Sequence, residues 1–139
     1  MEHVFDNCIF FRLNKIIRTL SQHADAAFSK HNLSSSHAYL LILVKNNPKI
    51  GTVELANILN LSPSTITRLV DKLEIQHFVF RERIGKRREI SCTGEGSVLA
   101  GELFNTWLEF RQQMQDLVGL EVYKLVENDL PQIEAKIFS

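Results

Sequence analysis

The chain has 139 residues, of which 45% are hydrophobic and 23% charged, a composition that is typical of an ordinary globular protein and excludes a disordered or fibrous chain. This length suffices to bury a hydrophobic core without a disulfide or a metal ion. The formal net charge of zero argues against a protein that coats nucleic acid by bulk charge, and no apolar stretch is long enough to span a membrane.

A long amphipathic helix is the first predicted element. Apolar residues recur every three or four positions from Phe5 to Phe28, and the pattern ends near Asn32. Leu33 and Ser34 then fit a hydrophobic staple residue and an N-cap, so a second helix is predicted over 35–45, stopped by the segment 46–48 with its proline.

Two short helices follow. The first spans about 52–59, with Thr52 as its predicted cap, and ends at Asn60. The second opens with Ser62 as N-cap and Pro63 at the first helical position, where a missing N–H costs nothing. Its predicted buried stripe consists of Ile66, Leu69, Val70 and Leu73. Two short helices joined by a few turn residues predict a helix-turn-helix.

A β-hairpin is predicted over 78–92, where β-branched and aromatic residues alternate with charges and Gly85 forms the tip. Thr93 then caps a helix that runs to about Val118. A last helical segment covers 120–138 and is expected to be interrupted at 128–131, where Asn128 or Asp129 could cap a new start before Pro131.

This order of elements resembles the MarR family of winged-helix regulators over essentially the whole chain. The resemblance rests on the stretches Thr52–Ala56, Ser62–Glu74 and Thr93–Gly96. It implies a mainly α fold with a small β-hairpin wing, and one domain over 1–139. Within that domain, 33–93 would be the DNA-binding lobe, while 1–32 and 94–139 would be dimerisation helices that interlock between two subunits.

The resemblance also implies a small-molecule site between the dimerisation helices and the DNA-binding lobe. Independently of it, the surplus apolar helices at both ends favour association with a partner. One departure concerns the wing. The family commonly carries an Asp two residues before an Arg that reaches the groove, whereas the tip here reads RIGKRR over 83–88 without that Asp.

Charge along the chain agrees with a DNA-binding lobe. The segment 78–90 has five basic and two acidic residues, a net charge of +3, while the residues from Gly101 onward have seven acidic and three basic, a net charge of −4. A basic patch on a neutral or acidic body is typical of a protein that meets phosphate with one face.

Residues of the second short helix and of the wing are the candidate DNA contacts. A recognition helix needs short polar side chains near its N-terminus, and Arg68 is the favoured base reader because a guanidinium can bond both O6 and N7 of guanine. The wing bases would follow the backbone or enter the minor groove. The candidates are Ser62, Ser64, Thr65, Thr67, Arg68, Arg83, Lys86, Arg87 and Arg88.

Each candidate has a structural alternative. Ser62 caps its helix whether or not it touches DNA, and Arg68 could instead pair with Asp71 on a solvated face. A cluster of bases is often only a solvated loop. After a helix-turn-helix, the DNA-binding interpretation is favoured.

The sequence has no motif for metal binding, thiol chemistry or catalysis. The histidines His3, His23, His31, His37 and His77 lack metal-ligand spacing, and Cys8 and Cys92 fit no CxxC pattern. Cys8 lies roughly where peroxide-sensing relatives carry a reactive cysteine, yet no neighbouring base is evident to lower its pKa. Without a nucleophile elbow, phosphate loop or paired carboxylates, we expect no enzyme, no metal and no cofactor.

The sequence therefore predicts a cytoplasmic, homodimeric transcriptional repressor that binds a pseudo-palindromic DNA duplex and responds to a small-molecule effector. The alternative is a winged-helix module that binds protein and has no DNA role. The basic wing and the hydroxyl-rich helix face argue against the alternative, because protein interfaces prefer aromatic and apolar anchors.

Overall fold

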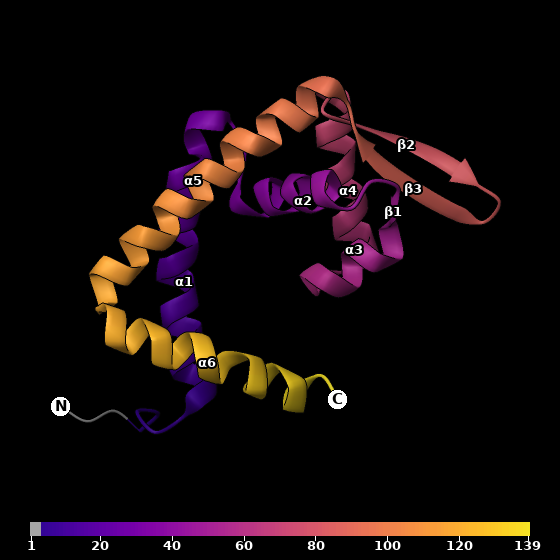
Figure 1. Ribbon diagram of the computed structural model, residues 1–139. Coiled ribbons are helices and arrows are strands. Elements are labelled where there is room, and N and C mark those ends of the chain that lie inside the picture. The colour runs from indigo at the N-terminus through magenta and orange to yellow at the C-terminus, as the bar shows by residue number, and fades with distance from the viewer. Residues whose placement is uncertain (1–3) are drawn as a thin grey trace. The chain divides into compact units, whose positions relative to one another are not determined.

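The computed structural model describes residues 4–139, so His3 lies outside the described residues (Figure 1). Over this range the chain forms six α-helices, a short 3₁₀ helix and a three-stranded antiparallel sheet. The predicted mainly α fold with a β-hairpin wing is confirmed. The chain divides into two compact units, Met1–Asn105 and Thr106–Ser139. The predicted functional division at residues 32 and 93 stays a prediction.

The first two helices follow the sequence pattern closely. α1 spans Ile9–Phe28 and begins later than expected, because the residues around Phe5 form a turn in which its carbonyl accepts from the Cys8 N–H at 2.9 Å. After the 3₁₀ turn Ser29–His31, α2 spans Ser35–Asn46. Ser34 is its N-cap as predicted, with the Oγ accepting from the His37 N–H at 3.4 Å.

The helix-turn-helix consists of α3, Thr52–Leu59, and α4, Pro63–Ile75. The prediction that Thr52 caps α3 is wrong: Gly51 is the N-cap, and Thr52 is the first helical residue. The reason is tertiary. Gly51 belongs to a two-residue strand, β1, Ile50–Gly51, and its pairing opposite Glu89 holds it extended.

The wing is formed by β2, Val79–Ile84, and β3, Arg87–Cys92, and β1 pairs with the far side of β3 to give the order β1-β3-β2. Gly85 has a φ of 62° in the turn between β2 and β3, which confirms it as the predicted tip. Figure 1 shows the hairpin projecting beyond α2, α3 and α4.

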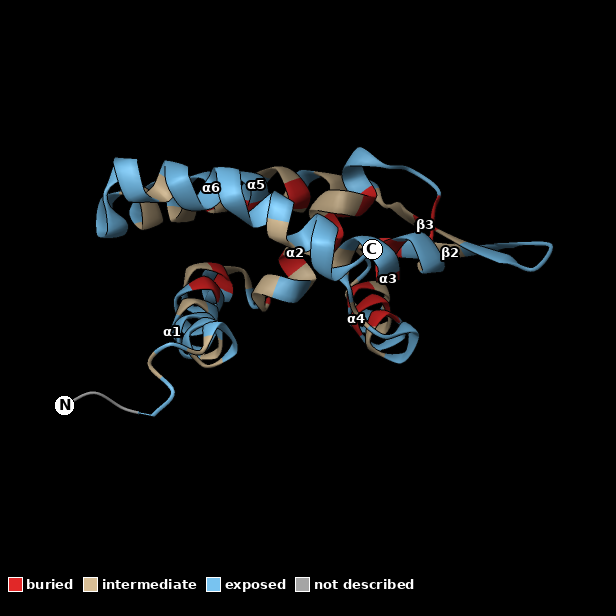
Figure 2. Ribbon diagram, turned by 90° about the horizontal axis from the view of Figure 1, so that it is seen from below, coloured by how far each residue is buried: buried red, intermediate tan, exposed pale blue. Residues whose placement is uncertain are grey.

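The core of the first unit lies where α2, α3, α4 and the sheet meet. The predicted stripe of α4 is buried throughout, with Ile66, Val70 and Leu73 fully inaccessible. Figure 2 shows buried residues gathered along α2 and α4 while the wing tip is exposed. Burying each such side chain stabilises the fold by roughly 1.5–3 kcal/mol, so this core fixes the position of α4.

The last two helices are α5, Gly94–Val118, and α6, Leu120–Ile137. Thr93 caps α5 as predicted, its Oγ1 accepting from the Gly96 N–H at 3.0 Å. The predicted interruption at 128–131 is wrong, because α6 is continuous through Pro131. Proline removes one backbone donor, but its fixed φ is a helical value, so the helix can continue past it at the loss of that one hydrogen bond. None of the helices of residues 4–139 is sufficiently long and apolar to cross a membrane.

Candidate nucleic-acid interface

The N-terminus of α4 is organised by the hydroxyl of Ser62. Its Oγ accepts from the Thr65 N–H at 3.2 Å and lies 2.8 Å from Thr65 Oγ1 and 3.1 Å from Ser64 Oγ. The predicted capping role is confirmed. Three hydroxyls therefore gather at the end of the helix where the backbone N–H groups and the helix dipole favour an anion.

Farther along α4, the outer face carries Ser64, Thr67 and Arg68, all exposed and opposite the buried stripe. The Thr67 hydroxyl donates to the Pro63 carbonyl at 3.0 Å, so its oxygen still has room to accept. Arg68 has no ion pair within residues 4–139, and its proposed alternative partner Asp71 is bonded to Arg81 instead. The guanidinium of Arg68 thus remains available to a partner outside the chain.

Arg81 connects the wing to the recognition helix. Its guanidinium binds the Asp71 carboxylate, lies 3.3 Å from Glu74 Oε1 and donates to the Thr67 carbonyl at 3.2 Å, while its own backbone N–H donates to Glu74 Oε2 at 3.2 Å. With a side chain only 24% exposed, Arg81 acts as a structural link between β2 and α4. The sequence did not show this role, because Asp71 and Glu74 look like an ordinary solvated helix face.

Arg87 is similarly engaged, on the other strand of the wing. Its Nη2 lies 2.9 Å from Glu54 Oε1 and donates to the Lys49 carbonyl at 3.4 Å, and its Nε lies 3.3 Å from Glu89 Oε1. These partners come from α3, from the residue before β1 and from β3 itself. Arg87 therefore links the wing to the helix-turn-helix from the side opposite to Arg81.

The remaining wing bases, Arg83, Lys86 and Arg88, are exposed and form no ion pair within residues 4–139. Arg83 and Arg88 lie directly opposite each other on β2 and β3, and the Arg83 Nε donates to the Gly85 carbonyl at 3.1 Å. Like charges on directly opposed residues repel, and an anion between them would relieve the repulsion. The wing tip therefore has three positive charges that no carboxylate of the described residues neutralises.

These features lie in one segment of the chain, and the sequence of that segment is similar to a known protein family. Residues 33–90 match the MarR family. Over these residues the chain is similar to that family. The match covers α2, the helix-turn-helix and most of the wing, so it confirms the resemblance inferred from the residues.

Solved structures share the fold over nearly the whole chain. A MarR protein from Peptoclostridium difficile is 17% identical, with a TM-score of 0.85 over 99% of this chain and 92% of its own. The Staphylococcus aureus MepR–DNA complex is 16% identical, with a TM-score of 0.80 over 92% and 97%. CouR from Rhodococcus jostii RHA1, bound to p-coumaroyl-CoA, is 20% identical, with a TM-score of 0.81 over 95% of each chain. At these identities the likeness shows the fold alone. No curated protein sequence matches the chain.

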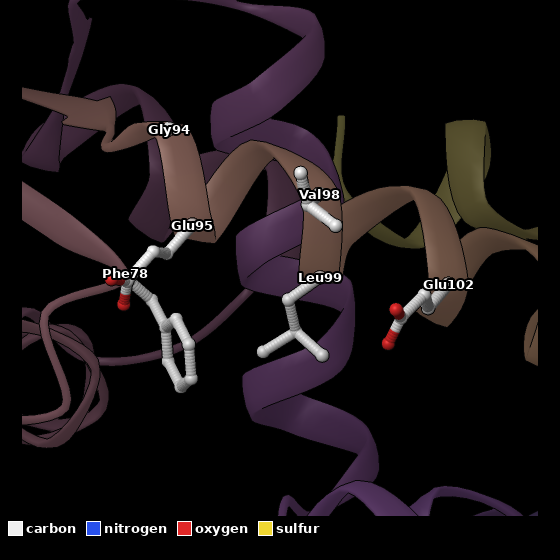
Figure 3. Close-up of a pocket in the computed structure, with 6 residues that line it drawn as sticks. All are labelled: Phe78, Gly94, Glu95, Val98, Leu99 and Glu102. Atoms are coloured by element: carbon white, nitrogen blue, oxygen red, sulfur yellow. The ribbon is translucent and has the colours of Figure 1, made fainter.

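A shallow, open hollow of about 450 Å³ lies between Phe78, the residue before β2, and the first turns of α5 (Figure 3). Figure 3 shows the ring of Phe78 and the side chain of Leu99 on its apolar side. Two carboxylates, Glu95 and Glu102, stand on the same helix face. The hollow is open to solvent over most of its surface, so its walls would cover only part of a ligand.

Neither a disulfide nor a cluster of metal ligands is present among residues 4–139. Both cysteines are free thiols, and burial raises the pKa of Cys92, an effect that the nearby Lys45 partly offsets. A thiol with a raised pKa is a poor nucleophile at neutral pH. Among residues 4–139, no group of three or more His, Cys, Asp or Glu side chains could hold a metal ion.

Proposed function

We propose that this chain is a sequence-specific DNA-binding transcriptional regulator and not an enzyme. The single observation that carries the proposal is the group of exposed basic side chains on α4 and the wing that have no internal ion pair within residues 4–139. Arg68 on α4 and three bases at the wing tip lie exposed without an internal ion pair in the described residues. The MepR–DNA complex, which has the same fold, supports this proposal.

In the proposed complex, α4 enters a major groove with its N-terminus near a phosphate. Arg68 reads a base edge, since its guanidinium can bond bidentately to guanine. The hydroxyls of Ser62, Ser64, Thr65 and Thr67 hold phosphate oxygens or thymine edges. Arg83, Lys86 and Arg88 meet the backbone or the adjacent minor groove. In this arrangement α4 provides sequence specificity, and the wing contributes mainly to affinity.

The proposal includes a homodimer. α1 exposes a row of large apolar side chains, among them Ile9 at 64%, Ile16 at 53% and Ile17 at 55% exposure. In the second unit, α6 has no buried residue, and Leu125 is 58% exposed. A second copy covering these helices would remove that surface from water and would place two recognition helices on a pseudo-palindromic duplex.

We further propose that the regulator is a repressor whose DNA affinity changes when a small-molecule effector binds. CouR, with the same fold, is known bound to p-coumaroyl-CoA. An effector shifts DNA binding only if it prefers one conformation of the dimer over another. Its effect would therefore appear as a change in operator affinity in the presence of the compound.

Fluorescence anisotropy tests the DNA-binding proposal. The protein is titrated against a duplex taken from just upstream of its own coding region, against a scrambled duplex, and at several salt concentrations. We expect tight, selective binding of two subunits per duplex with a steep salt dependence. A complete lack of binding at low salt contradicts the proposal and favours the protein-interaction module. Weak binding that is equal on all sequences removes its sequence-specific part.

A further inference from the structure

We propose that Arg87 is a positioning residue, which fixes the wing against α3 through Glu54 and Glu89 and does not itself bind DNA. The inference rests on the proposed DNA-binding function, and it deepens it by separating the wing bases into two kinds. The sequence predicted Arg87 as one of several equivalent DNA contacts. Its surroundings favour a different role.

The Arg87 side chain contacts three parts of the lobe: α3, β3 and the residue before β1. The Nη2 atom reaches Glu54 Oε1 at 2.9 Å on α3, and the Nε atom reaches Glu89 Oε1 at 3.3 Å on β3. The guanidinium crosses the backbone at Gly51, where a Cβ atom would be 3.5 Å from the Arg87 Cζ and from Glu54 Oε1. β1 is only two residues long, so these side-chain bonds reinforce the weakest strand of the sheet.

Charge gives a second reason. Around Arg87, one positive group faces two carboxylates, so the cluster has a net negative charge and would repel a phosphate. Glu89 is only 15% exposed, and its Oε2 is buried without a hydrogen-bond partner in the described part of the chain. If Arg87 turned away to reach DNA, this mostly buried carboxylate would lose its cation, which is costly.

The other wing bases differ in both respects. Arg83 and Arg88 oppose each other across the hairpin and have no acidic partner within residues 4–139, and Lys86 lies at the tip. Along a strand, side chains alternate between faces, so Arg87 lies on the opposite face of β3 from Arg88. The hairpin thus has one face with uncompensated arginines and one face where Glu54 and Glu89 neutralise Arg87.

The test is the effect of Glu54→Ala on DNA affinity, because the two roles of Arg87 predict opposite signs. If Arg87 binds a phosphate directly, removing Glu54 frees Arg87 and deletes a negative charge, so DNA binding becomes tighter. If Arg87 positions the wing, Glu54→Ala binds DNA roughly two- to five-fold more weakly than a variant that lacks another exposed carboxylate, the range expected for an exposed ion pair. Glu102→Ala is the control for the loss of one carboxylate, since Glu102 is an exposed acid on α5 without an ion pair in the described residues, whereas Glu82 lies directly opposite Glu89.

Two further readouts complete the experiment. We expect Arg87→Ala to leave the salt slope of DNA binding unchanged, whereas Arg88→Ala lowers it by about one, the value for one lost phosphate contact. The double variant Arg87→Ala/Glu54→Ala should bind as Arg87→Ala alone does, because both changes break the same link. Binding by Glu54→Ala that is as tight as that of Glu102→Ala or tighter, or a reduced salt slope for Arg87→Ala, would overturn the inference.

Amide hydrogen exchange in the free protein separates this inference from the proposed function. We expect Arg87→Ala, but not Arg88→Ala, to speed amide exchange at Glu89 and Ile90, the residues of β3 that lie opposite β1. If the wild-type protein bound no duplex, the proposed function would fail, but faster exchange in Arg87→Ala would still show that Arg87 holds the wing in place. Equal exchange in the two variants would overturn the positioning role.

Discussion

Gly96 lies directly against the backbone of Phe78: a Cβ atom on Gly96 would be 1.8 Å from the Phe78 carbonyl oxygen and 2.7 Å from its carbonyl carbon. The same carbonyl accepts from the Thr93 N–H at 3.0 Å, and the Thr93 hydroxyl donates to the His77 carbonyl at 2.7 Å. The start of α5 is therefore held tightly to the segment that joins α4 to the wing.

Replacing Gly96 with alanine should consequently destabilise the protein by about 1–3 kcal/mol, the cost of overpacking a close contact. Alanine at an unhindered helical position would instead stabilise it by up to roughly 1 kcal/mol. Urea unfolding measures the difference. Gly94→Ala is the control, because a Cβ atom at Gly94 meets nothing within 4 Å. Equal stability of the two variants would contradict the packing argument.

Arg81→Ala should weaken the attachment of the wing to α4. The loss in unfolding free energy should lie between the roughly 1 kcal/mol of an exposed ion pair and the roughly 3 kcal/mol of a buried one, since Arg81 is 24% exposed. A double-mutant cycle with Glu74→Ala measures the coupling. Arg83→Ala, on the same strand and exposed, serves as control and should change stability little. Additive effects of Arg81→Ala and Glu74→Ala would show that the pair does not couple.

Stability should fall as the pH is lowered, because of His37. Burial, together with the nearby Lys72, lowers the pKa of His37 below its ordinary value of 6.5, and its Nδ1 lies 2.6 Å from the Ser34 Oγ. Between the folded and unfolded pKa values, the unfolded chain binds more protons, so the stability is fully present above pH 6.5 and decreases below it. Unfolding free energies at pH 5 to 8, values chosen to bracket the histidine range, check this. His37→Gln should flatten the dependence, and an equally steep curve for that variant would rule out His37 as its source.

Arg68→Ala should reduce binding to the specific duplex more than to a scrambled one. A bidentate base contact is worth roughly 1–3 kcal/mol of discrimination, whereas a phosphate contact contributes equally on every sequence. Lys86→Ala is the comparison, because it should weaken both and lower the salt slope. Equal losses on both duplexes for Arg68→Ala would remove its assignment as a base reader.

Ile16→Glu should convert the proposed dimer to a monomer. Ile16 is 53% exposed on α1, so a charge there need not disturb the core of its own chain, but it would be buried at an interface between copies. Sedimentation velocity gives the mass of the particle. Gln22→Glu, an exposed position on the opposite face of α1, is the matched control. A dimeric Ile16→Glu variant would exclude this face from the interface.

The sequence alone determined the features that depend on local chemistry. Ser34, Ser62 and Thr93 were recognised as caps because a side-chain oxygen satisfies backbone donors only a few residues away. The buried stripe of α4 followed from helical spacing, and Gly85 from the positive φ that its turn requires. The order of elements, and with it the MarR-family resemblance, needed nothing more.

Only the tertiary structure decided which partner each charged or strained residue has. β1 is too short to have a pattern and exists because β3 pairs with it, and that pairing moved the start of α3 from Thr52 as cap to Gly51. The pairings of Arg81 with Asp71 and of Arg87 with Glu54 join residues 10 and 33 positions apart, and sequence periodicity carries no information on such contacts. A charge in a sequence can face water, DNA or another side chain, and the choice depends on what folding brings within a few ångströms of it.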